Sequence, residues 1–209
     1  MAGRYLRQRD AYMAARSLVG KSPPVGCYTQ FHASGAYGQW DTHVRGAKGG
    51  TMVAADQAVQ TVDRVADFFI LQVDEEAGDV MTSLRLQKLV YYAQSWHLAL
   101  AGMPLFEEEF EAWVHGPVVP SLYFKYRGMS NASLPRPDGP PPEFVQRSLE
   151  ILNDVWDEYG QYSAKRLEEL THAEDPWKDA RRGHSPAELS NQVIPKDAMR
   201  VFYAARLPG

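Results

Sequence analysis

The middle of this 209-residue chain contains the stretch LQKLVYYAQSWH, residues 86–97. Its apolar residues recur at helical spacing, which predicts a helix that is capped by a hydroxyl side chain at 82–83 and stops at Gly102. The neighbouring tyrosines Tyr91 and Tyr92 project about 100° apart on a helix, so they do not both face one flat core. Two interpretations stay open: a helix buried on two sides, or a helix whose rings form a contact surface.

Apolar stripes on both sides of this stretch predict further helices. They run from Asp56 to about Ala77, from 120 to 127, from 144 to 160, from a cap at Ser163, from 177 to 182 and from Pro195. Residues 110–115 alternate between apolar and polar and predict a strand or an extended segment. We therefore expect a mostly α-helical fold, a single compact bundle of about seven helices with at most one short strand pair.

Charge divides the chain into two parts. Residues 1–51 carry seven basic and two acidic residues, a net charge of +5, and half of the 16 glycines. Residues 52–209 carry the remaining 15 basic and 24 acidic residues, a net charge of −9. The first part has too few aliphatic residues to offset the entropy of ordering, so we predict an irregular or disordered extension. A transit peptide or a basic arm that binds nucleic acid are the alternatives.

The residues Lys48-Gly49-Gly50-Thr51 immediately precede Met52. A lysine codon followed by two glycine codons can spell GGAGG, which has the sequence of a bacterial ribosome-binding site. We therefore hypothesise that translation starts at Met52 and that the extension is not translated natively. The functional domain would then be residues 52–209.

Composition excludes several classes of protein and site. The single cysteine, Cys27, excludes an intramolecular disulfide framework and a multi-cysteine zinc site. The longest apolar runs are too short to cross a bilayer, so we expect a cytoplasmic protein without a membrane partner. The net charge of −4 argues against a generic nucleic-acid-binding protein. The chain contains no HExxH, GxSxG, GxGxxG or Walker motif, so we predict no catalytic residue, metal site or cofactor.

Four ordered motifs carry a resemblance to a known family. They read LxKLVYYAQxWH at 86–97, GxPLF at 102–106, EAWVxGPVVPSLY at 111–123 and LTHxxDPWxxAR at 170–181. With these motifs, the chain from about 59 to 205 resembles the Panacea domain, the domain of SocA-like antitoxins. His115 departs from the family pattern, which has a tyrosine before the Gly-Pro pair. Residues 1–51 have no counterpart in the family.

The resemblance implies an antitoxin of a type II toxin–antitoxin system, carried by a bacterium or phage beside its toxin. Such a protein binds and neutralises a cognate protein toxin. For SocA-like members the resemblance further implies a proteolytic adaptor that delivers the toxin to a ClpXP-type protease. An acidic helical domain without a recognisable catalytic motif agrees with a binding protein that uses no cofactor.

Two sets of residues are candidates for this role. The first set joins aromatic rings to an acidic rim and is the candidate toxin-contact surface: Tyr92, Trp96, Glu111, Trp113 and Tyr123. The second set belongs to the family motifs and is expected to be structural: Lys88, Tyr91, Gly116, Pro117, Pro120, His172, Pro176, Trp177 and Arg181. Within it, Trp177 and Arg181 lie one helical turn apart, where arginine can stack on tryptophan.

Two functions from other classes stay open. One is a DNA-binding transcriptional autorepressor that uses the basic N-terminal part as an arm, and its binding would weaken steeply with salt. The other is a small hydrolase-type enzyme. It requires His172, Asp175 and Arg181 to converge in a cleft with His97 or Glu111.

Overall fold

The computed structural model describes residues 27–32, 39–44, 59–129, 132–185 and 187–207. The chain divides into two compact units, Met1–Met52 and Val53–Gly209. Within the described residues, no helix combines the length and the apolar character that crossing a bilayer requires.

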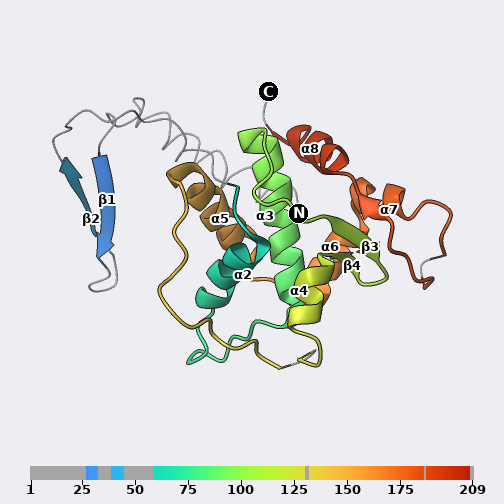
Figure 1. The fold of residues 1–209 in the computed structure, drawn as a ribbon, viewed down its shortest axis with the longest axis horizontal. Coiled ribbons are helices and arrows are strands. Elements are labelled where there is room, and N and C mark those ends of the chain that lie inside the picture. The colour runs from blue at the N-terminus through green and yellow to red at the C-terminus, as the bar shows by residue number, and fades with distance from the viewer. Residues whose placement is uncertain (1–26, 33–38, 45–58, 130–131, 186, 208–209) are drawn as a thin grey trace. The chain divides into compact units, whose positions relative to one another are not determined.

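The first unit contains a β-hairpin (Figure 1). Strand β1 (Cys27–His32) pairs antiparallel with β2 (Gln39–Val44), with Cys27 opposite Val44 and His32 opposite Gln39. Both segments contain several β-branched or aromatic residue types, which favour extended backbone. The other residues of the predicted irregular or disordered extension, 1–51, lie outside the described residues.

The second unit is mostly helical, and its described residues form seven helices and one small sheet. The helices are α2 (Val62–Leu71), α3 (Ser83–Ala101), α4 (Pro120–Lys125), α5 (Gln146–Tyr159), α6 (Ala164–His172), α7 (Asp175–Ala180) and α8 (Lys196–Ala204). In the sheet, β3 (Phe110–Trp113) pairs antiparallel with β4 (Gly116–Val118) on one side and β5 (Val193–Ile194) on the other. The predicted helical bundle is confirmed, and β5 adds a third short strand to the expected pair.

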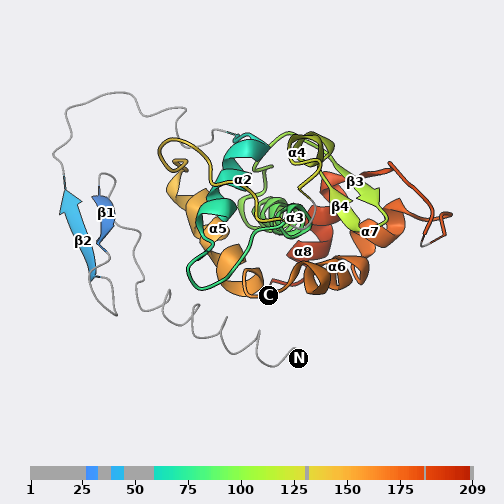
Figure 2. The ribbon, with the colours of Figure 1, turned by 90° about the horizontal axis from the view of Figure 1, so that it is seen from below.

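Helix α3 lies in the middle of this unit. Figure 2 looks along its axis, with α2 and α5 on one side and α6, α8 and the sheet on the other. The predicted boundaries of the helix are confirmed: the Thr82 side chain caps its first turn, and Gly102 ends it in the left-handed conformation. Every residue from 85 to 98 is buried, because other elements pack around the whole helix.

Helix α2 is shorter than the predicted helix, 56–77. The predicted cap, Asp56, lies outside the described residues, and the observed cap is Thr61. Beyond the last turn of α2, the Asp74 carboxylate accepts the backbone N–H of Ala77 at 3.1 Å. This bond between a side chain and its local backbone replaces helical pairing and turns the chain.

Candidate functional site

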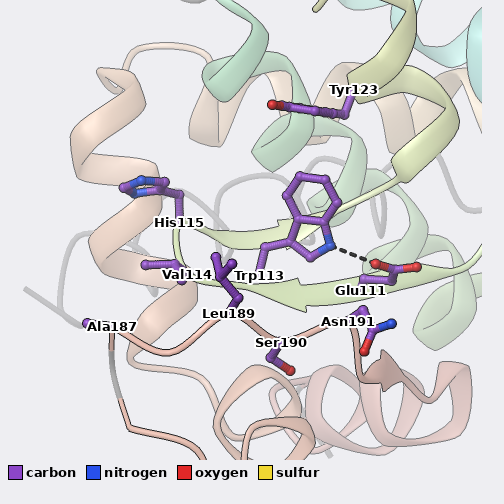
Figure 3. A pocket seen from close by; sticks show the side chains of 9 residues that line it. All are labelled: Glu111, Trp113, Val114, His115, Tyr123, Ala187, Leu189, Ser190 and Asn191. Atoms are coloured by element: carbon purple, nitrogen blue, oxygen red, sulfur yellow. Dashed lines mark hydrogen bonds between the residues drawn. The ribbon is translucent and has the colours of Figure 1, made fainter.

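A hollow lies beside β3. Its volume, about 660 Å³, is in the range of ligand-binding pockets. We call it the aromatic pocket. Figure 3 shows the side chains that line it: Glu111, Trp113, Val114, His115, Tyr123, Ala187, Leu189, Ser190 and Asn191. They come from β3 and the turn that follows, from α4, and from the segment 187–191. Segments far apart in the sequence therefore form one concave surface.

Two rings and one carboxylate form the most distinctive part of the aromatic pocket. The rings of Trp113 and Tyr123 meet edge to face, with their centroids 4.8 Å apart. The indole Nε1 of Trp113 donates a hydrogen bond of 2.7 Å to Glu111 Oε2, the dashed line in Figure 3. All three side chains are half-buried. The hydrogen bond orients the indole, so the ring and the acid are presented together.

Arg181 holds the wall of the aromatic pocket that segment 187–191 provides. Its guanidinium donates to the backbone carbonyl of Ala112 in β3 at 2.8 Å. It also donates to the carbonyls of Ser185 at 3.0 Å and Glu188 at 2.6 Å. Only 4% of Arg181 is exposed, so these charge-assisted bonds are shielded from water. One buried side chain therefore ties the loop to the strand.

Trp177 supports the same strand one residue further along. Its Nε1 donates to the backbone carbonyl of Trp113 at 3.0 Å. Its ring stacks on His172, with centroids 4.1 Å apart, and lies 5.2 Å from the Arg181 guanidinium. Burial lowers the pKa of His172, which favours a neutral imidazole in this stack. Pro176 is also buried, at the start of α7. These residues lie behind β3 and hold the backbone whose side chains line the pocket.

Helix α3 holds β4 through Lys88. The side chain is fully buried, and its Nζ donates to the Pro117 carbonyl at 2.9 Å. Burial lowers the pKa of Lys88 to about 7, although the nearby Glu168 carboxylate acts in the opposite direction. Gly116 has φ +95°, and a β-carbon there would lie 2.8 Å from both Lys88 Nζ and Thr171 Oγ1. The close approach of lysine and backbone therefore requires glycine.

The same helix positions α4, and with it the ring of Tyr123. Gln87 donates from Nε2 to the Val119 carbonyl at 3.2 Å and accepts the Val119 N–H at 2.9 Å. Pro120 then occupies the first turn of α4, where its missing N–H costs nothing. We refer to the residues behind the pocket as the buried support: Gln87, Lys88, Gly116, Trp177 and Arg181, which are buried, and His172, which is half-buried.

Two residues that we expected on the surface are buried. Only 1% of Tyr92 and 8% of Trp96 is exposed. Tyr92 stacks on Tyr159 with centroids 3.8 Å apart, and Trp96 packs edge to face on Tyr203 at 5.0 Å. The expectation that this helix presents exposed rings is therefore wrong, because α3 is enclosed by its neighbours on every side.

Tyr91 and Tyr92 belong to a cluster of tyrosines around Glu174. Glu174 Oε1 accepts from the Tyr92 hydroxyl at 3.3 Å, and Oε2 accepts from the Tyr203 hydroxyl at 2.7 Å. Burial raises the pKa of Glu174 to about 7, although the tyrosine hydroxyls act to lower it. None of these residues lines the aromatic pocket. We call this group the tyrosine cluster: Tyr91, Tyr92, Tyr159, Glu174 and Tyr203.

The structure brings together three of the five surface candidates, Glu111, Trp113 and Tyr123. Sequence reasoning missed the wall formed by segment 187–191, in which Leu189 is 87% exposed. A lone large aliphatic residue between polar neighbours was the available signal. The residues of the enzymatic alternative separate. Glu111 lines the pocket, whereas His172 stacks on Trp177 and Arg181 binds the Ala112 carbonyl behind β3.

Comparison with known proteins finds a family match over a region that contains most residues of the buried support. Residues 86–178 match the family model described as Antitoxin SocA-like, Panacea domain. Antitoxin SocA of Caulobacter vibrioides (strain NA1000 / CB15N) is 41% identical over 68 residues, which cover 32% of this chain. The match spans about a third, 36%, of that curated relative's length. No solved structure matches the chain significantly.

The matched region runs from the start of α3 into α7. It includes the rings of Trp113 and Tyr123 and every member of the buried support except Arg181. It ends before segment 187–191, so that wall of the aromatic pocket lies outside it. Over residues 86–178, less than half of its length, the chain is similar to the Panacea-domain family of SocA-like antitoxins.

Proposed function

We propose that this protein is the antitoxin of a type II toxin–antitoxin system and that it binds and neutralises a cognate protein toxin. The family match over residues 86–178 is the observation that carries the proposal. The similar protein from Caulobacter vibrioides bears the name antitoxin, although the alignment covers only part of each chain. Residues 52–209 contain the whole matched region and are proposed as the functional part.

We propose that the toxin contacts the aromatic pocket. Trp113 and Tyr123 present half-buried rings, and the exposed Leu189 stands at the edge of the same hollow. Tryptophan and tyrosine are the residue types most enriched at interface positions that dominate binding energy. They bury a large area and lose little conformational freedom, so a concave surface with such rings suits a protein partner.

The polar groups of the aromatic pocket support binding rather than catalysis. Ser190 Oγ accepts the Gln192 N–H at 3.2 Å, whereas His115 Nδ1 pairs with Glu168 at 2.8 Å. No hydrogen bond joins the serine to the histidine among the described residues, so a nucleophile and its base are not assembled there. We therefore propose a non-enzymatic role.

For the mechanism of neutralisation, we propose an adaptor that delivers the toxin to a ClpXP-type protease. The motif resemblance to SocA-like antitoxins supports this step. An adaptor must contact the toxin and the protease at the same time. The aromatic pocket occupies one side of the sheet and leaves other surfaces of the chain available for the second contact.

Neutralisation is tested with the reading frame that lies beside this gene. Its product is expressed alone, with residues 1–209, and with residues 52–209. We expect growth arrest in the first case, recovery in the other two, and co-elution of the purified proteins. A neighbour that is harmless, or an arrest that persists in the presence of the folded chain, would contradict the antitoxin proposal.

Delivery to the protease is tested separately through the lifetime of the toxin. The toxin is followed after translation is blocked, in host cells with and without ClpX. We expect this chain to shorten the lifetime several-fold only where ClpX is present. Recovery of growth with an unchanged lifetime would overturn the adaptor mechanism and leave direct inhibition in its place.

A further inference from the structure

The aromatic pocket contains one negative group in mainly apolar surroundings. Glu111 Oε2 accepts the Trp113 indole N–H at 2.7 Å, and the rings of Trp113 and Tyr123 lie beside it. Among the described residues, Glu111 forms no ion pair, and no further hydrogen bond satisfies its other oxygen. The carboxylate therefore keeps most of its acceptor capacity, and Figure 3 shows it at one end of the pocket.

Among the described residues, the two basic side chains discussed around the pocket have other partners. His115, at the other end of the lining, is paired through Nδ1 with Glu168 at 2.8 Å. Arg181 lies behind β3 and binds backbone carbonyls. A half-buried carboxylate gains most from a positive partner that also satisfies its acceptor positions. None of the described residues supplies such a partner to Glu111, so we look for it on another molecule.

We propose that the aromatic pocket binds an arginine side chain of the partner protein. Its guanidinium would donate to the Glu111 carboxylate and lie against the rings of Trp113 and Tyr123. The inference rests on the proposed function, since it specifies the chemistry of the toxin surface that docks there. The negative charge of Glu111 and the electron-rich ring faces are both complementary to a cation.

Three features favour arginine over lysine. A guanidinium is planar and stacks on aromatic faces, it donates in a fork to a carboxylate, and it is less strongly hydrated than an ammonium. The last property matters here because Val114, Leu189 and Ala187 make the surroundings apolar. The hollow of about 660 Å³ also accepts the residues next to the arginine, with Leu189 as an apolar contact.

The test uses three acetylated, amidated pentapeptides, Ala-Ala-X-Ala-Ala, in which X is arginine, lysine or citrulline. Citrulline keeps the shape of arginine and removes its charge. Binding is followed by the NMR signal of the Trp113 indole N–H, assigned with Trp113→Phe. We expect a saturable shift with the arginine peptide, weaker binding of the lysine peptide, and at least about tenfold weaker binding of the citrulline peptide.

Two variants link this preference to the carboxylate. Glu111→Gln still accepts the indole hydrogen bond but lacks the charge, so it should lose the preference for arginine over citrulline. Glu107→Gln removes an exposed acid of the same segment that does not line the pocket, and it should retain the preference. Near-UV circular dichroism verifies that both variants fold.

Two outcomes would overturn the inference: an indole N–H signal that does not shift when the arginine peptide is added, or equal affinities for the arginine and citrulline peptides. A Glu107→Gln effect as large as that of Glu111→Gln would also overturn it, because the preference would then reflect overall charge. These results are independent of growth rescue. If rescue succeeds and the arginine peptide does not bind, the antitoxin proposal stands and the arginine inference fails.

Discussion

The aromatic pocket and the tyrosine cluster both consist of aromatic rings beside one carboxylate. They differ in how many of the hydrogen-bond acceptor positions of that carboxylate are occupied. Both residues, Glu174 and Glu111, are half-buried, but both oxygens of Glu174 accept tyrosine hydroxyls. Glu111 accepts one indole N–H. A ring and an acid thus form a core element when every acceptor is paired, and a binding surface when acceptor capacity faces solvent.

The largest expected effect comes from breaking the tyrosine cluster. Tyr203 is 1% exposed and contacts Tyr91, Tyr92 and Trp96. Tyr203→Ala leaves a cavity and removes a donor from Glu174, so we expect the free energy of unfolding to fall by about 3–5 kcal/mol. Urea denaturation measures the change.

Tyr203→Phe is the matched control, because it removes only the hydroxyl. It should cost about 1–3 kcal/mol, the range for leaving a buried acceptor unpaired. Equal losses for the two variants would mean that the hydroxyl, and not the packing of the ring, accounts for the contribution of Tyr203.

The buried support is what joins α3 to the pocket, and Gly116 is its tightest point. Gly116→Ala forces a side chain into a left-handed backbone position and places its β-carbon 2.8 Å from Lys88 Nζ. We expect a loss of about 2–4 kcal/mol from strain and overpacking together. Gly128 has the same φ, +95°, but a β-carbon there would meet no other atom within 4 Å. Gly128→Ala should therefore lose only the strain, about 1 kcal/mol.

Thermal unfolding of both glycine variants makes this comparison. A similar loss at the two positions would indicate that the Lys88 side chain moves aside at little cost. In that case the contact between α3 and β4 would be less important for the pocket than its geometry implies.

The sequence predicts a feature of the fold when neighbouring residues cause it, and fails to predict one that depends on contacts between distant segments. The limits of α3 follow from Thr82 and Gly102, which act within one turn of the helix. The burial of Tyr92 and Trp96 depends instead on elements that pack around α3 from distant parts of the chain. Two rings on different faces of a helix suggested a surface, and a helix enclosed on all sides makes them core.

The same distinction applies to the candidate site. Glu111 and Trp113 are two residues apart on a strand, so their common face was predictable from alternation. The position of the wall at Leu189 was not predictable, because Arg181 places that segment through bonds to backbone carbonyls, which do not depend on the residue types that carry them. The arginine itself was expected to stack on Trp177, and the 5.2 Å separation is compatible with that contact.

The two buried ionisable groups predict opposite dependences of stability on pH. The pKa of Glu174 is raised from 4.5 to about 7, so its contribution is complete below pH 4.5 and is lost as pH rises through 7. The pKa of Lys88 is lowered from 10.5 to about 7, so the cost of its burial is relieved as pH rises from 7 toward 10.5.

Difference curves isolate each group from the other titrations of the protein. The free energies of unfolding of wild type, Glu174→Gln and Lys88→Met are compared at pH 5, 7 and 9. The difference between wild type and Glu174→Gln should shrink by about 2 kcal/mol from pH 5 to 7. The free energy of unfolding of wild type should increase relative to that of Lys88→Met between pH 7 and 9. Flat difference curves would show that these groups titrate normally.

The smallest effect on stability, and the sharpest test of the comparison, is expected at Tyr123. The ring is half-buried and contacts Trp113 at 4.8 Å, so Tyr123→Ala should cost only about 1 kcal/mol. If the pocket is the toxin-contact surface, the same change should weaken toxin binding at least about tenfold, because aromatic anchors dominate interfaces. The two variants would then have opposite effects: Tyr203→Ala would change the free energy of unfolding far more than the affinity of the folded protein for the toxin, and Tyr123→Ala would do the reverse.

Val201→Ser provides the surface control, since Val201 is 59% exposed on α8 and does not line the pocket. Calorimetric titration of the folded variants measures the affinities. Toxin binding that is equally tight for Tyr123→Ala and Val201→Ser would place the contact surface elsewhere on the domain.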